Sequence, residues 1–314
     1  MYLYVNEPRA MPEAFFARRP DMAGVREGDH RALCTSNPWV RDWMSNALAH
    51  VFREVPGLGG GFTITASENL TNCASHGQQA GCPRCQGRKP AEVIAEVNTA
   101  IAAGIHRGSP QAKLLAWDWG WPDSDAIGLL PKDVWLMSVS EWSLPIERGG
   151  VKNTVGEYSL SAPGPGPRAT AHWKIARAHV LKTAAKLQIN NTWELSAVPW
   201  LPVLDLVAEH CAGLAKQQVD GVMLSWSLVR LPLAQPPGRG AVRPQPESKP
   251  RGGPRRDRRP PLRREPDGES PRGLESVQCC LPRVPLRRAV LYNGPQQFGP
   301  ANLLFASPTG YHAT

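Results

Sequence analysis

Six apolar runs recur along the N-terminal two thirds of the chain, and each becomes polar at its C-terminal end. Branched and large apolar side chains fill each run, and a carboxylate, an asparagine or a tryptophan follows. The runs cover residues 2–8, 61–69, 113–121, 134–142, 185–194 and 220–227. Continuous apolar runs of this length predict strands that are buried on both faces of a sheet.

Segments with helical periodicity separate these runs, at 38–55, 90–105, 172–184 and 202–218. Alternation of strands and helices predicts an α/β fold with a parallel sheet. We interpret the six strands as the third to eighth strands of a (β/α)8 TIM barrel, so we expect an incomplete barrel that lacks its first two strands. The alternative is an open doubly wound sheet, although no Gly-x-Gly-x-x-Gly turn follows an early strand.

The net charge of +9 lies entirely within residues 230–288, which argues against nucleic-acid binding by the rest of the chain. This segment is rich in Arg and Pro and lacks periodicity, which predicts disorder or translation in a shifted frame. We therefore divide the chain into a partial barrel domain (1–229), this low-complexity segment (230–288) and a remnant of the domain's C-terminal part (289–314). No apolar run reaches membrane-spanning length and no signal peptide is visible, so we expect a cytoplasmic protein without a membrane partner.

Carboxylates at the ends of the predicted strands are the candidates for catalysis, because a barrel places its chemistry at the C-terminal ends of its strands. Glu68 is the expected general acid, since desolvation at such a position raises the pKa of a carboxyl group. Glu194 is the expected nucleophile, and Glu141 competes with it for that role. Asp118 and Glu7 are expected to contact substrate. Any of these acids taken singly can instead be a hydrogen-bonded framework residue.

Aromatic and amide side chains beside these acids predict a surface for sugars. Indole rings present large apolar faces with one polar edge, which suits stacking on a sugar ring. The expected sugar contacts are Trp117, Trp119, Trp193, Trp226, Asn69 and Asn191. Because side chains alternate along a strand, part of the tryptophans can equally fill the core.

A loop after Glu68 carries Cys73, His76, Cys82 and Cys85 at short spacing. Four such ligands can close a tetrahedral zinc site, so the loop predicts a structural zinc ion, and no other cofactor is required. Reduced thiols and a disulfide are the alternatives. Cys34 receives no role, and Cys211 is expected in the core.

Several of these stretches resemble TIM-barrel glycoside hydrolases, and in particular bacterial proteins related to the family 20 hexosaminidase barrels. The resemblance is carried by VNEPRAMP, TITASENLTNC, WDWGW, SVSEW, NNTWELSAVP and YNGPQQFGPANLL. It implies a catalytic acid at Glu68. In family 20 an Asp that orients the N-acetyl group precedes this acid, whereas Ser67 precedes it here, which favours two carboxylates over substrate-assisted chemistry.

The sequence therefore predicts a glycoside hydrolase that acts on a carbohydrate by a two-carboxylate retaining mechanism. Two alternatives stay open: a non-catalytic carbohydrate-binding barrel, and a metal-dependent hydrolase that uses the Cys/His loop. The missing strands leave open whether this chain is itself active.

Overall fold

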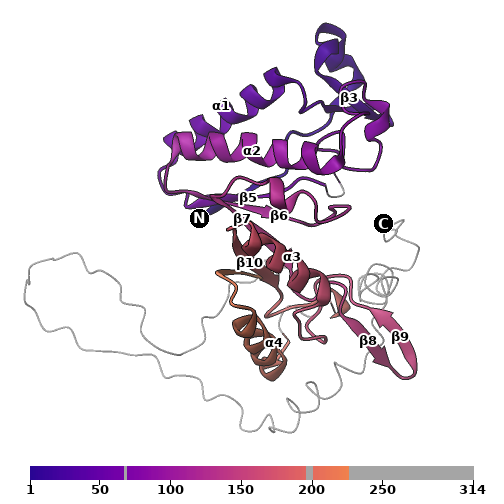
Figure 1. The fold of residues 1–314 in the computed structure, drawn as a ribbon, viewed down its shortest axis with the longest axis vertical. Helices are drawn as coiled ribbons and strands as arrows, with labels where there is room; N and C mark the ends of the chain where they lie inside the picture. Colours follow the sequence, from indigo (N-terminus) through magenta and orange to yellow (C-terminus); the bar gives the residue numbers. More distant parts are fainter. Residues whose placement is uncertain (67–68, 196–200, 226–314) are drawn as a thin grey trace, which may run out of the picture.

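The computed structural model describes residues 1–66, 69–195 and 201–225, and its centre is a parallel sheet (Figure 1). Its strands are β1 (Tyr2–Val5), β5 (Gly60–Ile64), β6 (Lys113–Trp117), β7 (Val134–Val139), β10 (Lys182–Leu187) and β11 (Gly221–Leu224). They are hydrogen-bonded in the order β1-β5-β6-β7-β10-β11, so that each strand lies beside the next one in the sequence. The six predicted strands are confirmed, and they form a curled sheet like half of a barrel. Closure into an eight-stranded barrel stays a prediction.

Four α-helices accompany the sheet in the described part of the chain: α1 (Pro38–Glu54), α2 (Pro90–Gly108), α3 (Pro167–Ala178) and α4 (Leu204–Gln217). Proline occupies the first turn of α1, α2 and α3, where its missing N–H costs no hydrogen bond. In α1, the side chain of Asn37 also accepts a hydrogen bond from the backbone N–H of Trp39 (2.9 Å). None of the described helices is both long and apolar enough to cross a membrane.

The predicted helix 172–184 is wrong at its C-terminal end. Helix α3 stops at Ala178, and β10 already begins at Lys182. Val180 adopts a left-handed backbone conformation with φ of 62°, which breaks the helical hydrogen-bond ladder. The chain turns there directly into the strand.

Alternate residues of the strands enter two different cores. Side chains such as Ala116, Leu136 and Leu187 pack toward the helices. Their neighbours in the sequence, such as Trp117 and Met137, form a second cluster on the opposite, inner face of the sheet. Because side chains alternate along a strand, the face on which a strand's last residue lies also determines which of the residues just beyond it face inward.

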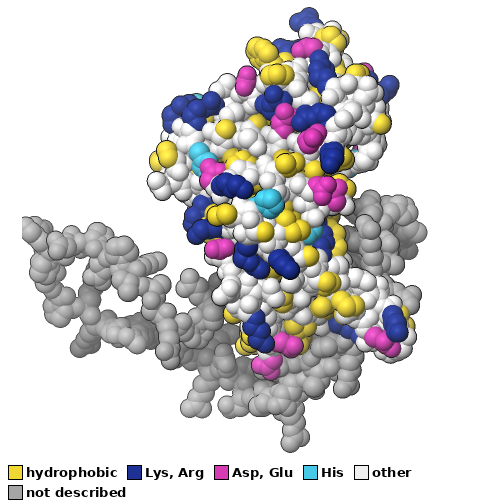
Figure 2. All heavy atoms as spheres, in the orientation of Figure 1, with side chains coloured by type: hydrophobic (Ala, Val, Ile, Leu, Met, Phe, Trp, Pro, Cys, Tyr) yellow, Lys and Arg dark blue, Asp and Glu magenta, His cyan; other side chains and the backbone are white. Residues whose placement is uncertain are grey.

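Two small antiparallel sheets, which the sequence did not predict, accompany the parallel one. One has the order β2-β4-β3, from β2 (Met11–Pro12), β3 (Ala23–Glu27) and β4 (His30–Leu33). The other is the hairpin of β8 (Pro145–Arg148) and β9 (Val151–Thr154). Figure 2 shows Lys, Arg, Asp and Glu side chains interspersed over the visible face of the described part. The segments 230–288 and 289–314 lie outside the described residues.

Candidate functional site

Glu141 lies just beyond the C-terminal end of β7, and its side chain is fully buried. One carboxylate oxygen, Oε1, accepts a hydrogen bond from the backbone N–H of Ser159 (3.1 Å). The other, Oε2, has no hydrogen-bond partner among the described residues. Burial raises the pKa of Glu141 and the charge of Glu157 adds to this effect, while the positive charge of Lys186 opposes it. The net effect is a raised pKa, so Glu141 keeps its proton to a higher pH than an exposed carboxyl group does.

Lys186 is a buried lysine on β10, the strand next to β7. Its Nζ donates to Oε1 of Gln188 (2.6 Å) and lies 3.9 Å from the centre of the Tyr158 ring. Burial lowers the pKa of Lys186, and the charges of Glu141 and Glu157 partly counter this effect. Glu141, Glu157 and Lys186 thus form one electrostatic group at the C-terminal ends of β7 and β10.

Aromatic rings surround this group. Trp119 donates a hydrogen bond from its indole Nε1 to Glu157, and its ring centre lies 6.0 Å from that of Trp142. The ring centres of Tyr158 and Trp193 are 4.7 Å apart. Indole and phenol rings beside a buried carboxyl group provide both apolar faces and polar edges.

Glu194, the predicted nucleophile, is saturated with hydrogen bonds. Its carboxylate accepts from the hydroxyls of Ser159 (2.9 Å), Thr192 (2.7 Å) and Ser161, and from the backbone N–H groups of Leu160 and Ser161 (3.2 Å each). The side chain is buried. These contacts tie the segment 159–161 to the loop that follows β10, so Glu194 has the environment of a framework acid.

Asp118 faces the helices rather than the inner face of the sheet. Its Oδ2 accepts hydrogen bonds from Ser138 Oγ (2.6 Å) and His172 Nδ1 (2.7 Å), and its Oδ1 lies 3.1 Å from Nη1 of Arg168. Burial raises the pKa of Asp118, but the hydrogen bond from His172 and the charge of Arg168 outweigh it, so the net effect is a lowered pKa. Asp118 is thus a buried, ionised carboxylate that joins β6, β7 and α3.

Ser140, beside Glu141, makes a second contact on the helix side. Its Oγ lies 2.5 Å from Nε2 of His210 on α4. Burial lowers the pKa of His210 to about 4, so the imidazole is neutral near pH 7. Ser140 therefore belongs to the contact between the sheet and α4.

The other residues predicted for the site make contacts with residues other than Glu141. Trp117 is fully buried in the inner core. Asn191 accepts a hydrogen bond from Gln188 at its side-chain oxygen (2.9 Å) and is also buried. At the end of β1, Glu7 is exposed and accepts a hydrogen bond from the backbone of Arg9 (2.7 Å), whose side chain donates to Asn69 (2.6 Å). Glu68 and Trp226 lie outside the described residues.

A cavity of about 420 Å³ lies at the other end of the strands. Among the described residues that line it the only acid is Asp220, which is engaged with the backbone N–H of Thr183 (2.8 Å). Its other lining residues are Tyr2, Phe62, Lys113, Leu115, Trp135, Ala184, Gly221, Val222 and Met223. A single engaged carboxyl group does not provide the chemistry that Glu141 and its neighbours do, so we place the candidate site at the C-terminal ends of the strands.

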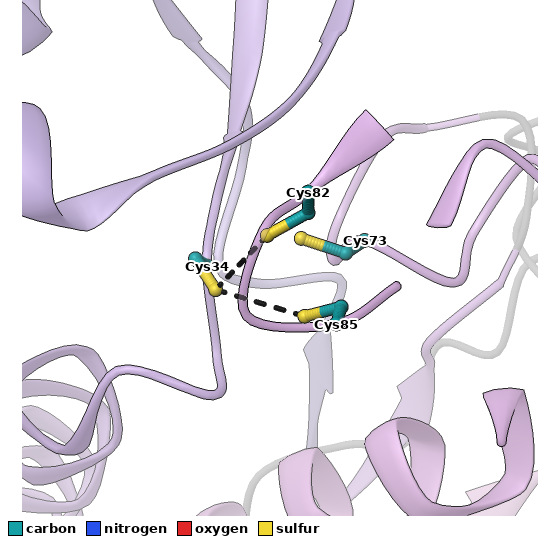
Figure 3. Close-up of side chains that lie close together, drawn as sticks. All are labelled: Cys34, Cys73, Cys82 and Cys85. Atoms are coloured by element: carbon teal, nitrogen blue, oxygen red, sulfur yellow. Dashed lines mark hydrogen bonds between the residues drawn. The ribbon is translucent and has the colours of Figure 1, made fainter. Parts of the chain in front are cut away.

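Four buried cysteines, Cys34, Cys73, Cys82 and Cys85, form a cluster that could hold a metal ion (Figure 3). The structure brings together three of the four predicted ligands. The fourth, His76, lies outside the cluster and pairs instead with Glu27, at 2.6 Å between Nδ1 and Oε2. Cys34 completes the set, although the sequence analysis gave it no role. Cys211, expected in the core, is exposed.

Sequence reasoning also missed Glu157 and Lys186. A signal for Lys186 was present, because a lysine within the apolar run 185–194 must place its charge inside the fold. Glu157 lies in a Gly- and Pro-rich loop, and no periodicity indicates that this loop folds over the strand ends.

Comparisons with known proteins give distant structural similarity only. No protein-family model and no curated protein matches the chain. The structure is similar to a GH138 enzyme targeting pectin rhamnogalacturonan II, with 14% sequence identity and a TM-score of 0.36 over 60% of this chain and 19% of that chain. It is also similar to an agarase, AgWH50C, with 10% identity and a TM-score of 0.39 over 71% of this chain and 36% of that chain. The chain thus spans about a fifth and about a third of these two proteins. Neither comparison supports the resemblance to family 20.

Proposed function

We propose that the chain is the sugar-cleaving part of a glycoside hydrolase, and that Glu141 is one of its two reactive carboxyl groups. The observation that carries this proposal is the environment of Glu141, a buried carboxyl group beyond the end of a parallel strand, with one oxygen free of hydrogen bonds from the described residues. A carboxyl group of raised pKa retains its proton at higher pH and can deliver it to a glycosidic oxygen. Glu141 therefore takes the role of general acid.

The neighbours of Glu141 suit a sugar substrate. Trp119, Trp142 and Trp193 offer ring faces, while Gln188 and Lys186 offer polar groups within the same region. Since the side chain of Glu141 is fully buried, a sugar reaches it only when neighbouring side chains move.

The second carboxyl group of the proposed retaining mechanism is Glu68, carried by the segment that follows β5. Glu194 fits this role less well, because five donors already occupy its oxygens and a nucleophile needs a free lone pair. The proposal thus keeps two carboxylates from the predicted set and moves the acid role to Glu141.

The two alternative functions make different demands on the site. A metal held by all four cysteines would have no open position for water, which disfavours a metal-dependent hydrolase. We therefore propose that any metal in this cluster has a structural role. A non-catalytic carbohydrate-binding protein would keep the aromatic rings but would not need the raised pKa of Glu141.

The test is hydrolysis of a panel of chromogenic aryl glycosides by the full chain and by the variant Glu141→Gln. We expect the variant to lose about a hundredfold or more in rate, as expected for the removal of a general acid. Glu147→Gln, at an exposed position of β8, is the matched control and should keep full activity. Equal rates for Glu141→Gln and the unmodified chain would refute the assignment.

An activated substrate separates the two carboxyl roles. A dinitrophenolate leaving group needs no protonation, so Glu141→Gln should cleave a dinitrophenyl glycoside far better than an alkyl glycoside. Glu68→Gln should lose activity on both substrates, because it removes the proposed nucleophile. If the full chain binds sugars but cleaves none of the panel, the carbohydrate-binding alternative is favoured.

A further inference from the structure

Four cysteine side chains, three from one loop and one from a distant part of the sequence, point toward one another in the interior (Figure 3). Cys34 follows β4, Cys73 lies in the loop after β5, and Cys82 and Cys85 form a Cys-x-x-Cys turn. Their sulfur atoms all lie within 4.8 Å of one another, and each residue has zero exposure. The Cys34 sulfur is 3.6 Å from that of Cys82 and 3.7 Å from that of Cys85.

These separations match those of a tetrahedral metal site. With zinc–sulfur bonds of about 2.3 Å, two thiolates of a tetrahedron lie about 3.8 Å apart. A disulfide would instead bring one pair to about 2.05 Å. Here Cys34 is nearly equidistant from two other sulfurs, which is the arrangement of a shared ligand rather than of a bonded pair.

We propose that these four cysteines bind a zinc ion, and that Cys34 is the ligand that completes the site. Four thiolates form a soft donor set that suits zinc or iron in tetrahedral geometry. The complete burial of the four residues, together with a full set of four protein ligands, makes this ion structural. The proposal is independent of the sugar chemistry suggested above.

Hydrogen bonds from neighbouring backbone and side-chain groups hold the Cys-x-x-Cys turn in place. The backbone N–H groups of Cys85 and Gln86 both donate to the carbonyl of Cys82 (3.0 and 2.9 Å), and the Gln79 side chain donates to the carbonyl of Cys85 (2.7 Å). Ser36 Oγ lies 3.2 Å from the Cys85 sulfur and accepts a hydrogen bond from Arg88 (2.6 Å). Such contacts behind the ligands orient them, and Arg88 is itself held in place by its ion pair with Glu96 (2.7 Å).

Gly24 of β3 shows how closely the chain is built around Cys73. A Cβ atom at position 24 would lie 2.6 Å from the Cys73 sulfur and 3.0 Å from the carbonyl oxygen of Ala32. These contacts are too short for any side chain larger than hydrogen. A glycine here lets the backbone approach the sulfur without displacing it.

The zinc ion would also fix the segment that leaves β5. Just before Cys73, Thr71 donates from its hydroxyl to the carbonyl of Thr65 (2.9 Å), and the Asn72 side chain donates to the same carbonyl. Thr65 Oγ1 in turn accepts a hydrogen bond from the Trp121 indole (3.0 Å). The ion would thus join the small β2-β4-β3 sheet to the C-terminal end of β5.

The test is the zinc content of the purified full chain and of three variants, measured by mass spectrometry after dialysis. We expect one zinc ion per chain, and a marked loss of zinc from Cys34→Ser, because this substitution removes one of the four ligands. His76→Ala should keep its zinc, because His76 lies outside the cluster. Cys211→Ser, which removes an exposed thiol, should keep it too.

A second measurement keeps the proposal testable if Cys34→Ser does not fold. The unmodified chain, unfolded with chelator and refolded with Co²⁺ in place of zinc, should show thiolate-to-cobalt charge transfer and the visible bands of a tetrahedral site. A folded chain that contains no zinc, and in which Cys34, Cys73, Cys82 and Cys85 all react with a thiol reagent, would overturn the proposal. So would iron in stoichiometric amount, or loss of zinc in His76→Ala with retention in Cys34→Ser.

Discussion

Replacement of Asp118 by Asn tests whether this acid at the end of β6 is a framework residue or part of the reaction. The substitution keeps the shape of the side chain and removes its charge. In the structure that charge faces Arg168 (3.1 Å) and His172 (2.7 Å), and it accepts a further hydrogen bond from Ser138 (2.6 Å). The contacts with Arg168 and His172 join the sheet to α3, the contact with Ser138 joins β6 to β7, and Asp118 is fully buried.

The expected loss of stability follows from these contacts. Removal of one partner from a buried ion pair costs roughly 3–5 kcal/mol, because the other charge stays buried without compensation. The Asn carbonyl can still accept one hydrogen bond from Ser138 or His172, so we expect a value at the lower end, about 3 kcal/mol. For a domain of this size each kcal/mol lowers Tm by about 2–4 °C, which gives a decrease of about 6–12 °C.

The effect should also depend on pH. The pKa of Asp118 is lowered in the folded state from its ordinary value of 3.8, so between the two pKa values the unfolded chain binds more protons than the folded one. The stabilisation by this carboxylate is therefore complete above pH 3.8 and is lost as the pH falls through the folded pKa. The difference in free energy of unfolding between the unmodified chain and Asp118→Asn should shrink as the pH falls over the same range.

Urea denaturation followed by tryptophan fluorescence measures these differences, and aryl-glycoside hydrolysis is measured on the same samples. Asp42→Asn, at an exposed position of α1, is the control and should change stability by less than about 0.5 kcal/mol. An Asp118→Asn variant with unchanged stability and abolished hydrolysis would refute the reasoning, because it would place Asp118 at the reaction rather than in the framework.

Two further substitutions test the packing described above. Glu194→Gln places an NH₂ group against donors that now face a carboxylate oxygen. Thermal unfolding should therefore show a loss of stability of about 1–3 kcal/mol. A fully stable variant that has lost hydrolysis would instead support the nucleophile role. Gly104→Ala places a Cβ 2.5 Å from the backbone oxygen of Ser45 and should cost about 1–3 kcal/mol by forcing α2 away from α1. Gly57→Ala, where no described atom lies within 4 Å of the added carbon, is its control, and equal stabilities for the two would contradict the close packing of these helices.

The apolar runs were sufficient to predict the six strands and their parallel arrangement, but they could not assign strand-end residues to a face. Strands covered on both sides are apolar at every position, so the run before Asp118 carries no alternation from which its direction could be read. In the structure Ala116 packs toward the helices and Trp117 lies in the inner core. This phase places Asp118 on the helix side, whereas Glu141 faces Lys186 and Glu157.

For the cysteine cluster, the sequence indicated the ligands that are close together along the chain but not the distant one. Short spacing alone indicated Cys73, Cys82 and Cys85, because a loop of a few residues can bring such ligands together without knowledge of the fold. The choice between His76 and Cys34 depended on a contact across 48 residues, the separation of Cys34 and Cys82. That contact is created by the small β2-β4-β3 sheet, whose short strands leave no periodic pattern in the sequence.

The environment of Glu141 arises from the order of the strands rather than from any local motif. Lys186 pairs in register with Val139, two positions before Glu141, so adjacency of β7 and β10 brings a buried lysine to a buried acid that lies far away in the sequence. Burial disfavours the charged form of each residue, while their mutual attraction favours it. A purely structural acid gains from complete hydrogen bonding, as Glu194 does. A carboxyl group kept near the balance between its two protonation states, with one oxygen unbonded among the described residues, is instead suited to give up and regain a proton.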